Sequence, residues 1–377
     1  MTIVYCIDNI HVTGGIEHVT LMKAGALAEV KDNIVWIVYT ESFPVRDGLL
    51  SSKVHTICLN INYYIDDWKS KWHVFKGFIF KRRRHRKRLS SVLHKINPDI
   101  VISVGRSEKH FLPNIPGKWK ILREFHSPKN YRWLSASSRF DKIAAWFGDR
   151  LDGIQLKKYD FIVVLTHEDL EQHWKNWKNI QVIPNPVRVS SHTALLTSKR
   201  LLAVGRLTPE KNFSSLIRAL CPVMEKHPDW RLDILGEGNE RLLLENLIQQ
   251  LSLQNNVFLQ GNQTNVSAWM EDSSMLVLTS RYEGFGLVLI EGMSSGLPVI
   301  AYACPCGPKD IIKDGQDGFL VAPEDEETLS ERICQLIEDE TLRKTMGASA
   351  RMRANDYCLD TVTEQWMTLF NHLLSKY

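Results

Sequence analysis

The chain has 377 residues, 44% hydrophobic and 24% charged, the composition of a soluble globular protein too long for a single core. No run approaches the roughly 20 uncharged apolar residues that span a bilayer, and seven scattered cysteines, an odd number, do not resemble a disulfide framework. The first residues lack the features of a signal peptide. We therefore expect a cytoplasmic protein.

Charge is distributed unevenly along the chain. Residues 1–187 contain 29 Lys and Arg against 18 Asp and Glu, a net charge of +11, whereas the remaining residues carry a net charge of −7. The first half is therefore expected to meet an anionic partner.

Short apolar and β-branched runs alternate with helical patterns in chain order. Such strands predict parallel sheets covered on both faces, and two sets predict an α/β protein with two doubly wound, Rossmann-like domains. Pro184-Asn185-Pro186 marks the boundary, because two prolines do not fit a helix or a central strand. The candidate strands are 2–7, 34–39, 55–59, 99–104, 120–124, 161–165 and 181–183, then 200–204, 231–235, 257–260, 275–279, 298–303 and 318–321.

The most informative segment is 280–319. After a candidate strand it continues with Glu283-Gly284-Phe285-Gly286, whose glycines let a backbone approach a ligand and expose its N–H groups. Helical spacing from Leu287 puts these amides at a helix N-terminus, where a diphosphate is stabilised. Glu283 and Glu291 then place two carboxylates around that phosphate site, suited to the hydroxyls of a sugar and a ribose.

Two weaker features belong with this segment. Arg206 and Lys211 follow the strand 200–204 and can together neutralise a diphosphate and stabilise it as a leaving group. Gly14-Gly15 follows the first strand and precedes a helical pattern from Glu17, so it can hold a phosphate from the other domain.

In this order the motifs resemble the retaining glycosyltransferases of family 4. The resemblance covers the plan of the whole chain and rests mainly on GRLTPEKN at 205–212, LGEGNE at 235–240, EGFGLVLIE at 283–291 and GLPVIA at 296–301. Within that family the chain looks most like enzymes that build bacterial capsule, lipopolysaccharide or lipid-linked oligosaccharides. The turn Pro305–Asp310 has Asp310 where the family more often has Glu.

The resemblance implies a GT-B fold, with two facing Rossmann-like domains and an interdomain donor cleft. Residues 1–187 would form the acceptor-side domain, joined by a C-terminal helix at 360–377, and residues 188–359 would bind the nucleotide sugar. Donor binding would involve Gly14, Gly15, Arg206, Lys211, Gly236, Gly238, Gly261, Asn262, Glu283, Gly284, Phe285, Gly286, Leu287, Val288 and Glu291.

The resemblance also implies individual roles. Arg206 and Lys211 would grip the diphosphate in place of a metal ion, so no metal and no cofactor are expected. Glu283 would bind the transferred sugar and Glu291 the ribose. His126, which follows the strand 120–124, would contact the sugar or its transition state as a fourth catalytic residue beside Arg206, Lys211 and Glu283, and Glu17 would contact the acceptor.

The segment 68–88 combines large aromatic and apolar residues with the dense basic run Lys81–Arg88. This combination suits peripheral contact with an anionic membrane, at the inner face of the cytoplasmic membrane, where a lipid-linked acceptor would be met. An amphipathic helix of the first domain with a solvated basic face is the alternative. No nucleic-acid fold signature accompanies the segment, so nucleic acid is not an expected partner.

The implied reaction retains the anomeric configuration, and the departing diphosphate takes the proton of the acceptor hydroxyl. The donor is expected to be a UDP-sugar, carrying an N-acetylhexosamine or galactose, and the acceptor a glycan or lipid-linked glycan of bacterial surface polysaccharide or glycoconjugate synthesis. A nucleotide-sugar epimerase of GT-B type and a non-catalytic sugar-nucleotide-binding module remain alternatives. A dehydrogenase is disfavoured, because no G-x-G-x-x-G follows a strand with an acidic residue about 20 positions on.

Overall fold

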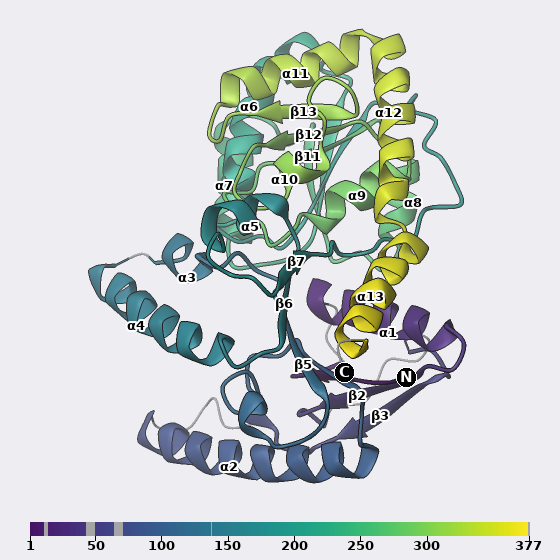
Figure 1. Cartoon of the computed structure of the whole chain (residues 1–377). Coiled ribbons are helices and arrows are strands. Elements are labelled where there is room, and N and C mark those ends of the chain that lie inside the picture. Colours follow the sequence, from purple (N-terminus) through teal and green to yellow (C-terminus); the bar gives the residue numbers. More distant parts are fainter. Residues whose placement is uncertain (11–13, 43–49, 64–70, 137, 376–377) are drawn as a thin grey trace. The chain divides into compact units, whose positions relative to one another are not determined.

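The computed structural model describes residues 1–10, 14–42, 50–63, 71–136 and 138–375, with side chains of 71–78 outside the description. The chain forms two compact units (Figure 1). The first contains residues 1–165, 173–186 and 362–377, and the second contains residues 166–172 and 187–361. Each unit is built around a parallel sheet, which confirms the predicted α/β class and the GT-B arrangement of two Rossmann-like domains.

The first unit contains a seven-stranded sheet in the order β3-β2-β1-β4-β5-β6-β7, parallel throughout. Strand β1 is central and pairs with β2 and β4, so it is buried from its second residue onward. The strands are β1 Thr2–Ile7, β2 Ile34–Tyr39, β3 Val54–Cys58, β4 Ile100–Ser103, β5 Lys120–Glu124, β6 Phe161–Val164 and β7 Ile180–Val182.

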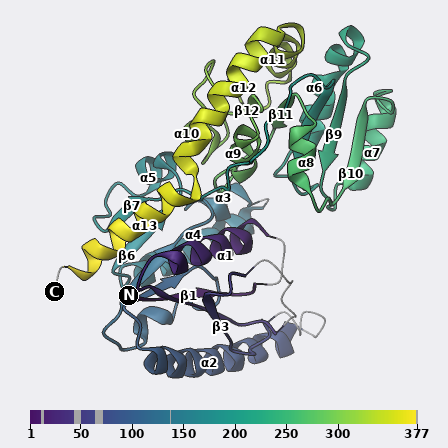
Figure 2. The same ribbon diagram turned by 90° about the vertical axis from the view of Figure 1, so that its right-hand side faces the viewer.

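Helices cover both faces of this sheet. Figures 1 and 2 show α1 and α13 on one face and α2 on the other. Helix α13 buries Trp366 and Phe370 in the same core as Tyr5 of β1 and Ile37 of β2. The helices are α1 Gly15–Glu29, α2 Lys71–Ile96, η2 Leu112–Asn114, α3 Tyr131–Leu134, α4 Arg139–Leu156 and α13 Leu359–Leu374. Helix α5 His167–His173 belongs to the second unit up to Gln172.

The second unit contains a six-stranded parallel sheet in the order β10-β9-β8-β11-β12-β13. Its core includes Leu201, Ile234 and Val277 of the strands, packed against α6 and α11. The strands are β8 Arg200–Val204, β9 Arg231–Leu235, β10 Val257–Gly261, β11 Met275–Leu278, β12 Val299–Tyr302 and β13 Gly318–Val321. The helices are α6 Phe213–Lys226, α7 Arg241–Gln250, α8 Val266–Glu271, α9 Leu287–Ser294, α10 Pro308–Ile311, α11 Glu326–Glu338, α12 Glu340–Ala354 and η3 Asn355–Tyr357.

The packing of α13 can be tested by truncating its largest buried side chain. Replacing Trp366 with Ala removes a side chain that is 1% exposed. We expect the free energy of unfolding to fall by about 3–5 kcal/mol in urea titrations followed by far-UV circular dichroism. The control Thr368→Ala, on the exposed face of the same helix, should change it by less than about 0.5 kcal/mol. Equal effects of the two changes would show that α13 is not part of the core.

Candidate active site

The strand order of the second sheet defines where a ligand can bind. From β8 the chain moves outward to β9 and β10, and from β11 it moves the other way to β12 and β13. The loops after β8 and β11 therefore diverge at the carboxyl edge of the sheet, where folds of this topology are expected to bind a ligand in a crevice. Arg206 and Lys211 follow β8, and Glu283 follows β11.

Lys211 and Glu283 meet across this crevice. The Lys211 Nζ lies 2.5 Å from Glu283 Oε1, and the two side chains are only 17% and 10% exposed. Ser280 Oγ donates to the same carboxylate oxygen at 2.6 Å, and the Glu283 amide donates to the Pro305 carbonyl at 3.1 Å. A shielded cation and a carboxylate of fixed orientation are thus held side by side.

Arg206 differs from Lys211 in its exposure. Its side chain is 76% exposed, and Nη2 lies 2.9 Å from Glu210 Oε1. An exposed pair of this kind contributes little to stability. The guanidinium is therefore available to leave Glu210 for a stronger anion.

Helix α9 begins directly after Gly286, with Leu287 and Val288 in its first turn. Their amides are among those that an α-helix leaves without an intrahelical acceptor. Glu291 lies one turn further along, where burial alone raises the pKa of its carboxyl group to about 7. Gly284 and Phe285 lie between Glu283 and this helix, and Phe285 is buried.

Close backbone contacts fix the other loops at this edge. Gly236 has a φ of +137°, and a Cβ there would stand 2.0 Å from the Gly205 carbonyl oxygen. Its amide donates to the Gly261 carbonyl at 2.8 Å. A Cβ at Gly238 would stand 2.2 Å from the Leu207 carbonyl oxygen. The loops after β8, β9 and β10 thus lie in direct backbone contact with one another. Asn262 follows the last of them and is exposed.

The turn before α10 supports the Glu283 loop. Gly307 has a φ of +141°, and its Cα faces the Phe285 carbonyl so closely that a Cβ would stand 2.1 Å from that oxygen. Asp310 accepts hydrogen bonds from the amides of His167 and Glu168, at 3.0 and 3.2 Å. The Asp310 carboxylate, which stands where the family more often has Glu, therefore fixes the first turn of α5.

The first sheet has a similar crevice between β1 and β4. Asp8, after β1, accepts hydrogen bonds from the Arg106 amide at 2.9 Å and from Ser107 Oγ at 2.5 Å, after β4. Glu108 lies nearby, and burial, then the charge of Asp8, raises its pKa to about 7. These residues were not singled out from the sequence, although each closely follows an apolar strand.

Of the residues predicted in the first unit, Gly14 and Gly15 lie at the start of α1, and Glu17 occupies its first turn. Burial is the main cause that raises the pKa of Glu17.

His126 belongs to a buried charged cluster that includes two residues missed in the sequence. Its Nε2 lies 3.1 Å from Glu124 Oε1, and Glu124 forms an ion pair with Lys23 of α1. Burial alone would raise the pKa of Glu124, but Lys23 and His126 lower it to about 2. Burial also lowers the pKa of His126, in spite of the carboxylate beside it. His126 is therefore a neutral imidazole at pH 7.

The basic segment 68–88 lies only partly within the described chain. Residues 68–70 and the side chains of 71–78 fall outside the description, while Lys81–Arg88 continue along α2. Within the described chain, no helix is long and apolar enough to cross a membrane.

One group of described residues could hold a metal ion, with ligand atoms of His227, Cys334 and Glu338 within 4.8 Å of one another. His227 caps the end of α6 and Glu338 ends α11, so the group lies at the amino edge of the sheet, opposite the Lys211–Glu283 crevice.

Comparisons with known proteins show the family to which the chain is similar. The family described as "Glycosyl transferases group 1" matches residues 190–353. An uncharacterised glycosyltransferase of Methanocaldococcus jannaschii is 32% identical over 343 residues, covering 77% of this chain and 83% of the relative. The poly(ribitol-phosphate) alpha-N-acetylglucosaminyltransferase of Staphylococcus aureus is 28% identical over 257 residues, covering 67% of this chain and 50% of the relative.

The fold is similar to that of S. aureus TarM, solved with UDP, alpha-GlcNAc-glycerol and fondaparinux. The TM-score is 0.76 at 19% identity, covering 98% of this chain and 99% of that one. The chain spans 24%, 60% and 50% of the length of three of the curated relatives it matches.

The raised pKa of the partly buried Glu291 predicts a measurable pH dependence of stability. Between its ordinary pKa of 4.5 and the raised value of about 7, the folded chain keeps a proton that the unfolded chain has lost. Glu291 therefore lowers stability as pH rises through this window, by up to about 3 kcal/mol. In urea titrations from pH 4.5 to 8, Glu291→Gln should gain stability relative to wild type by that amount. Parallel curves for the two proteins would contradict the assignment.

Proposed function

The chain belongs to the group 1 family of glycosyl transferases, and we propose that it moves a sugar from a UDP-sugar onto a glycan or lipid-linked glycan of bacterial surface polysaccharide or glycoconjugate synthesis. The proposal includes retention of the anomeric configuration, as in glycosyltransferase family 4, and an N-acetylhexosamine or galactose as the transferred sugar. The observation that carries it is the Lys211–Glu283 ion pair at the crevice of the second sheet.

The two members of the ion pair suit the two groups joined by the bond that must break, which are the sugar and the diphosphate. A diphosphate offers more negative charge than Glu283, so Lys211 can turn to it, together with Arg206 and the first amides of α9. Glu283 is then free to accept hydrogen bonds from the hydroxyls of the sugar. Glu291, partly buried one turn into α9, can accept from the ribose.

The family resemblance extends the assignment to the first unit. Gly14 and Gly15 are assigned to the diphosphate, Glu17 to the acceptor and His126 to the sugar. A neutral imidazole suits that task, because it can donate or accept a hydrogen bond without adding a charge that would compete for the diphosphate.

The relatives support the choice of donor and acceptor. The TarM structure contains UDP, and the S. aureus relative is named as an N-acetylglucosaminyltransferase acting on a poly(ribitol-phosphate). Both are consistent with a UDP-linked N-acetylhexosamine and a surface polymer as substrates of this chain.

The proposed reaction breaks the bond between the anomeric carbon and the diphosphate oxygen, and forms a bond from that carbon to an acceptor hydroxyl oxygen on the same face. The hydroxyl proton passes to the departing diphosphate. Lys211 and Arg206 stabilise the charge that grows on the diphosphate as the bond breaks. They take the place of a metal ion, so EDTA should leave the rate unchanged.

Peripheral membrane contact is part of the proposal. On α4, six large apolar side chains are at least 49% exposed and share one side of the helix, which is unusual for a surface helix. They are Phe140, Ile143, Trp146, Phe147, Leu151 and Ile154. With the basic run 81–88 of α2, this face should bind phosphatidylglycerol vesicles in a flotation assay, more weakly as salt increases.

Release of nucleoside diphosphate tests the function. We would measure it with a panel of UDP- and GDP-sugars, with and without a bacterial membrane lipid extract as the source of acceptor. One UDP-sugar should be consumed only when the extract is present. Lys211→Ala and Glu283→Ala should each lower kcat by about 10²–10³. The control Lys199→Ala, which removes a lysine from an exposed ion pair with Asp229, should retain activity.

Other outcomes of this assay would overturn the proposal. Consumption that is independent of any acceptor indicates an epimerase or a hydrolase, and consumption of GDP-sugars alone contradicts the choice of nucleotide. Full activity of Glu283→Ala would remove the observation on which the proposal rests.

A further inference from the structure

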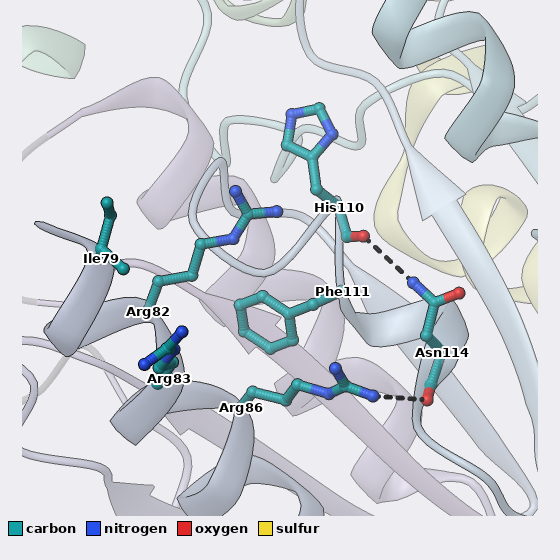
Figure 3. A pocket seen from close by; sticks show the side chains of 7 residues that line it. All are labelled: Ile79, Arg82, Arg83, Arg86, His110, Phe111 and Asn114. Carbon is teal, nitrogen blue, oxygen red and sulfur yellow. Dashed lines mark hydrogen bonds between the residues drawn. The ribbon is translucent and has the colours of Figure 1, made fainter.

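A hollow of about 570 Å³ lies on the first unit, between α2 and the segment that follows β4. This volume is in the range of sites that bind small molecules. Figure 3 shows the ring of Phe111 between the side chains of Arg82 and Arg86, with His110 and Asn114 on the opposite wall. The lining residues are Ile79, Arg82, Arg83, Arg86, His110, Phe111 and Asn114.

The lining is cationic and contains no acidic side chain. Among described residues, no carboxylate is within ion-pairing distance of Arg82, Arg83 or Arg86. Within the part of the chain that the structure describes, the one hydrogen bond that these guanidiniums donate runs from Arg86 Nη2 to the Asn114 carbonyl, at 3.3 Å. Burial is the main cause that lowers the pKa of His110 to about 4; Lys109 and Arg82 also lower it, and Asp152 opposes them.

This set of groups suits a phosphate better than a carboxylate. Each guanidinium presents a planar fork of donors that matches two phosphate oxygens, and three of them match the charge of a diphosphate. His110 adds no positive charge to the pocket, and its Nε2 lies 3.3 Å from Asp152 Oδ1. The apolar surface of Ile79 and Phe111 can pack against the carbon chain that carries such a phosphate.

A chain of contacts connects the lining of the pocket with the carboxyl edge of the first sheet. The Phe111 ring packs edge-on against His85, with centroids 4.9 Å apart, and His85 Nδ1 lies 3.1 Å from the Tyr63 hydroxyl. The Tyr63 amide donates to Glu41 Oε1 at 2.9 Å, just beyond β2. This chain of contacts leads from the pocket to the edge where β1, β4 and β5 end, the edge that holds Asp8, Glu17 and His126.

We propose that the pocket formed by Arg82, Arg83 and Arg86 binds a phosphate or diphosphate group of the acceptor, so that this enzyme acts on a phosphate-bearing acceptor. The inference rests on the proposed glycosyl transfer, since it assigns the substrate of the first unit. The proposal also gives two roles to the basic run of α2. Its pocket-lining arginines bind the acceptor phosphate, whereas Arg84 and Lys87 of the same helix do not line the pocket and are left for the membrane contact.

Binding of inorganic pyrophosphate, measured by isothermal titration calorimetry, tests the pocket. All proteins carry R206Q and K211Q, which remove the cations assigned to the donor. In this background, R82Q/R86Q should weaken pyrophosphate binding at least tenfold. The matched pair R84Q/K87Q removes the same charge from exposed positions of α2 and should weaken it less than twofold. Circular dichroism verifies that both variants fold.

Two further assays, with the donor cations restored, identify the source of the phosphate. With membrane lipid extract as acceptor, R82Q/R86Q should raise the apparent KM for the extract at least tenfold more than R84Q/K87Q does, because the two pairs share the loss of membrane contact and only the first changes the pocket. With phosphatidylglycerol vesicles, both pairs should weaken flotation alike.

The proposal is overturned if pyrophosphate does not bind. Equal weakening of pyrophosphate binding by both pairs would overturn it as well, because binding then depends on the total positive charge of α2 and not on the pocket. It is also overturned if R82Q/R86Q affects flotation alone, which would assign the pocket to lipid headgroups. A wild type that consumes no sugar donor would instead refute the proposed function and the acceptor assignment, while the pyrophosphate result would still decide whether the pocket binds phosphate.

Discussion

The Lys211–Glu283 ion pair is the interaction on which the site depends. The strand order runs outward from β8 in one direction and from β11 in the other, which opens a crevice at the carboxyl edge of the second sheet. The Lys211–Glu283 pair spans this crevice at 2.5 Å. Ser280 and the turn before α10 hold the carboxylate in place. Lys211, the less exposed of the two cations that we propose to bind the diphosphate, is thus neutralised by Glu283 in the absence of a stronger anion.

The first sheet has the same topology as the second, but it positions different groups. Asp8 and the amides that follow β4 lie at its crevice between β1 and β4. Glu124 and His126 lie at the end of the neighbouring strand β5. Burial of Lys23 against Glu124 keeps a negative charge beside His126 without making the imidazole cationic. A neutral His126 and a cationic arginine pocket are thus features of one unit, available for different parts of a substrate.

Much of the fold follows from local sequence pattern, and less of the site does. The strands of the described chain end within one residue of the predicted runs, and the signal is continuous in strands such as β1, β4 and β11, which are buried on both faces. Glu283 and Lys211 could be predicted because glycine-rich turns mark their loops. Lys23 could not, since its partner Glu124 is 101 residues away and a lysine within a helix has the pattern of surface. Likewise, no pattern links the basic run of α2 to His110.

Binding of UDP and of the UDP-sugar that is turned over, compared in wild type, Lys211→Ala and Glu283→Gln by calorimetry, tests the central claim most directly. If Glu283 neutralises Lys211 until the diphosphate replaces it, Glu283→Gln should bind UDP at least as tightly as wild type but lose sugar transfer. Lys211→Ala should weaken both ligands at least tenfold. Unchanged UDP binding in Lys211→Ala, or UDP binding in Glu283→Gln that weakens as much as in Lys211→Ala, would contradict this account.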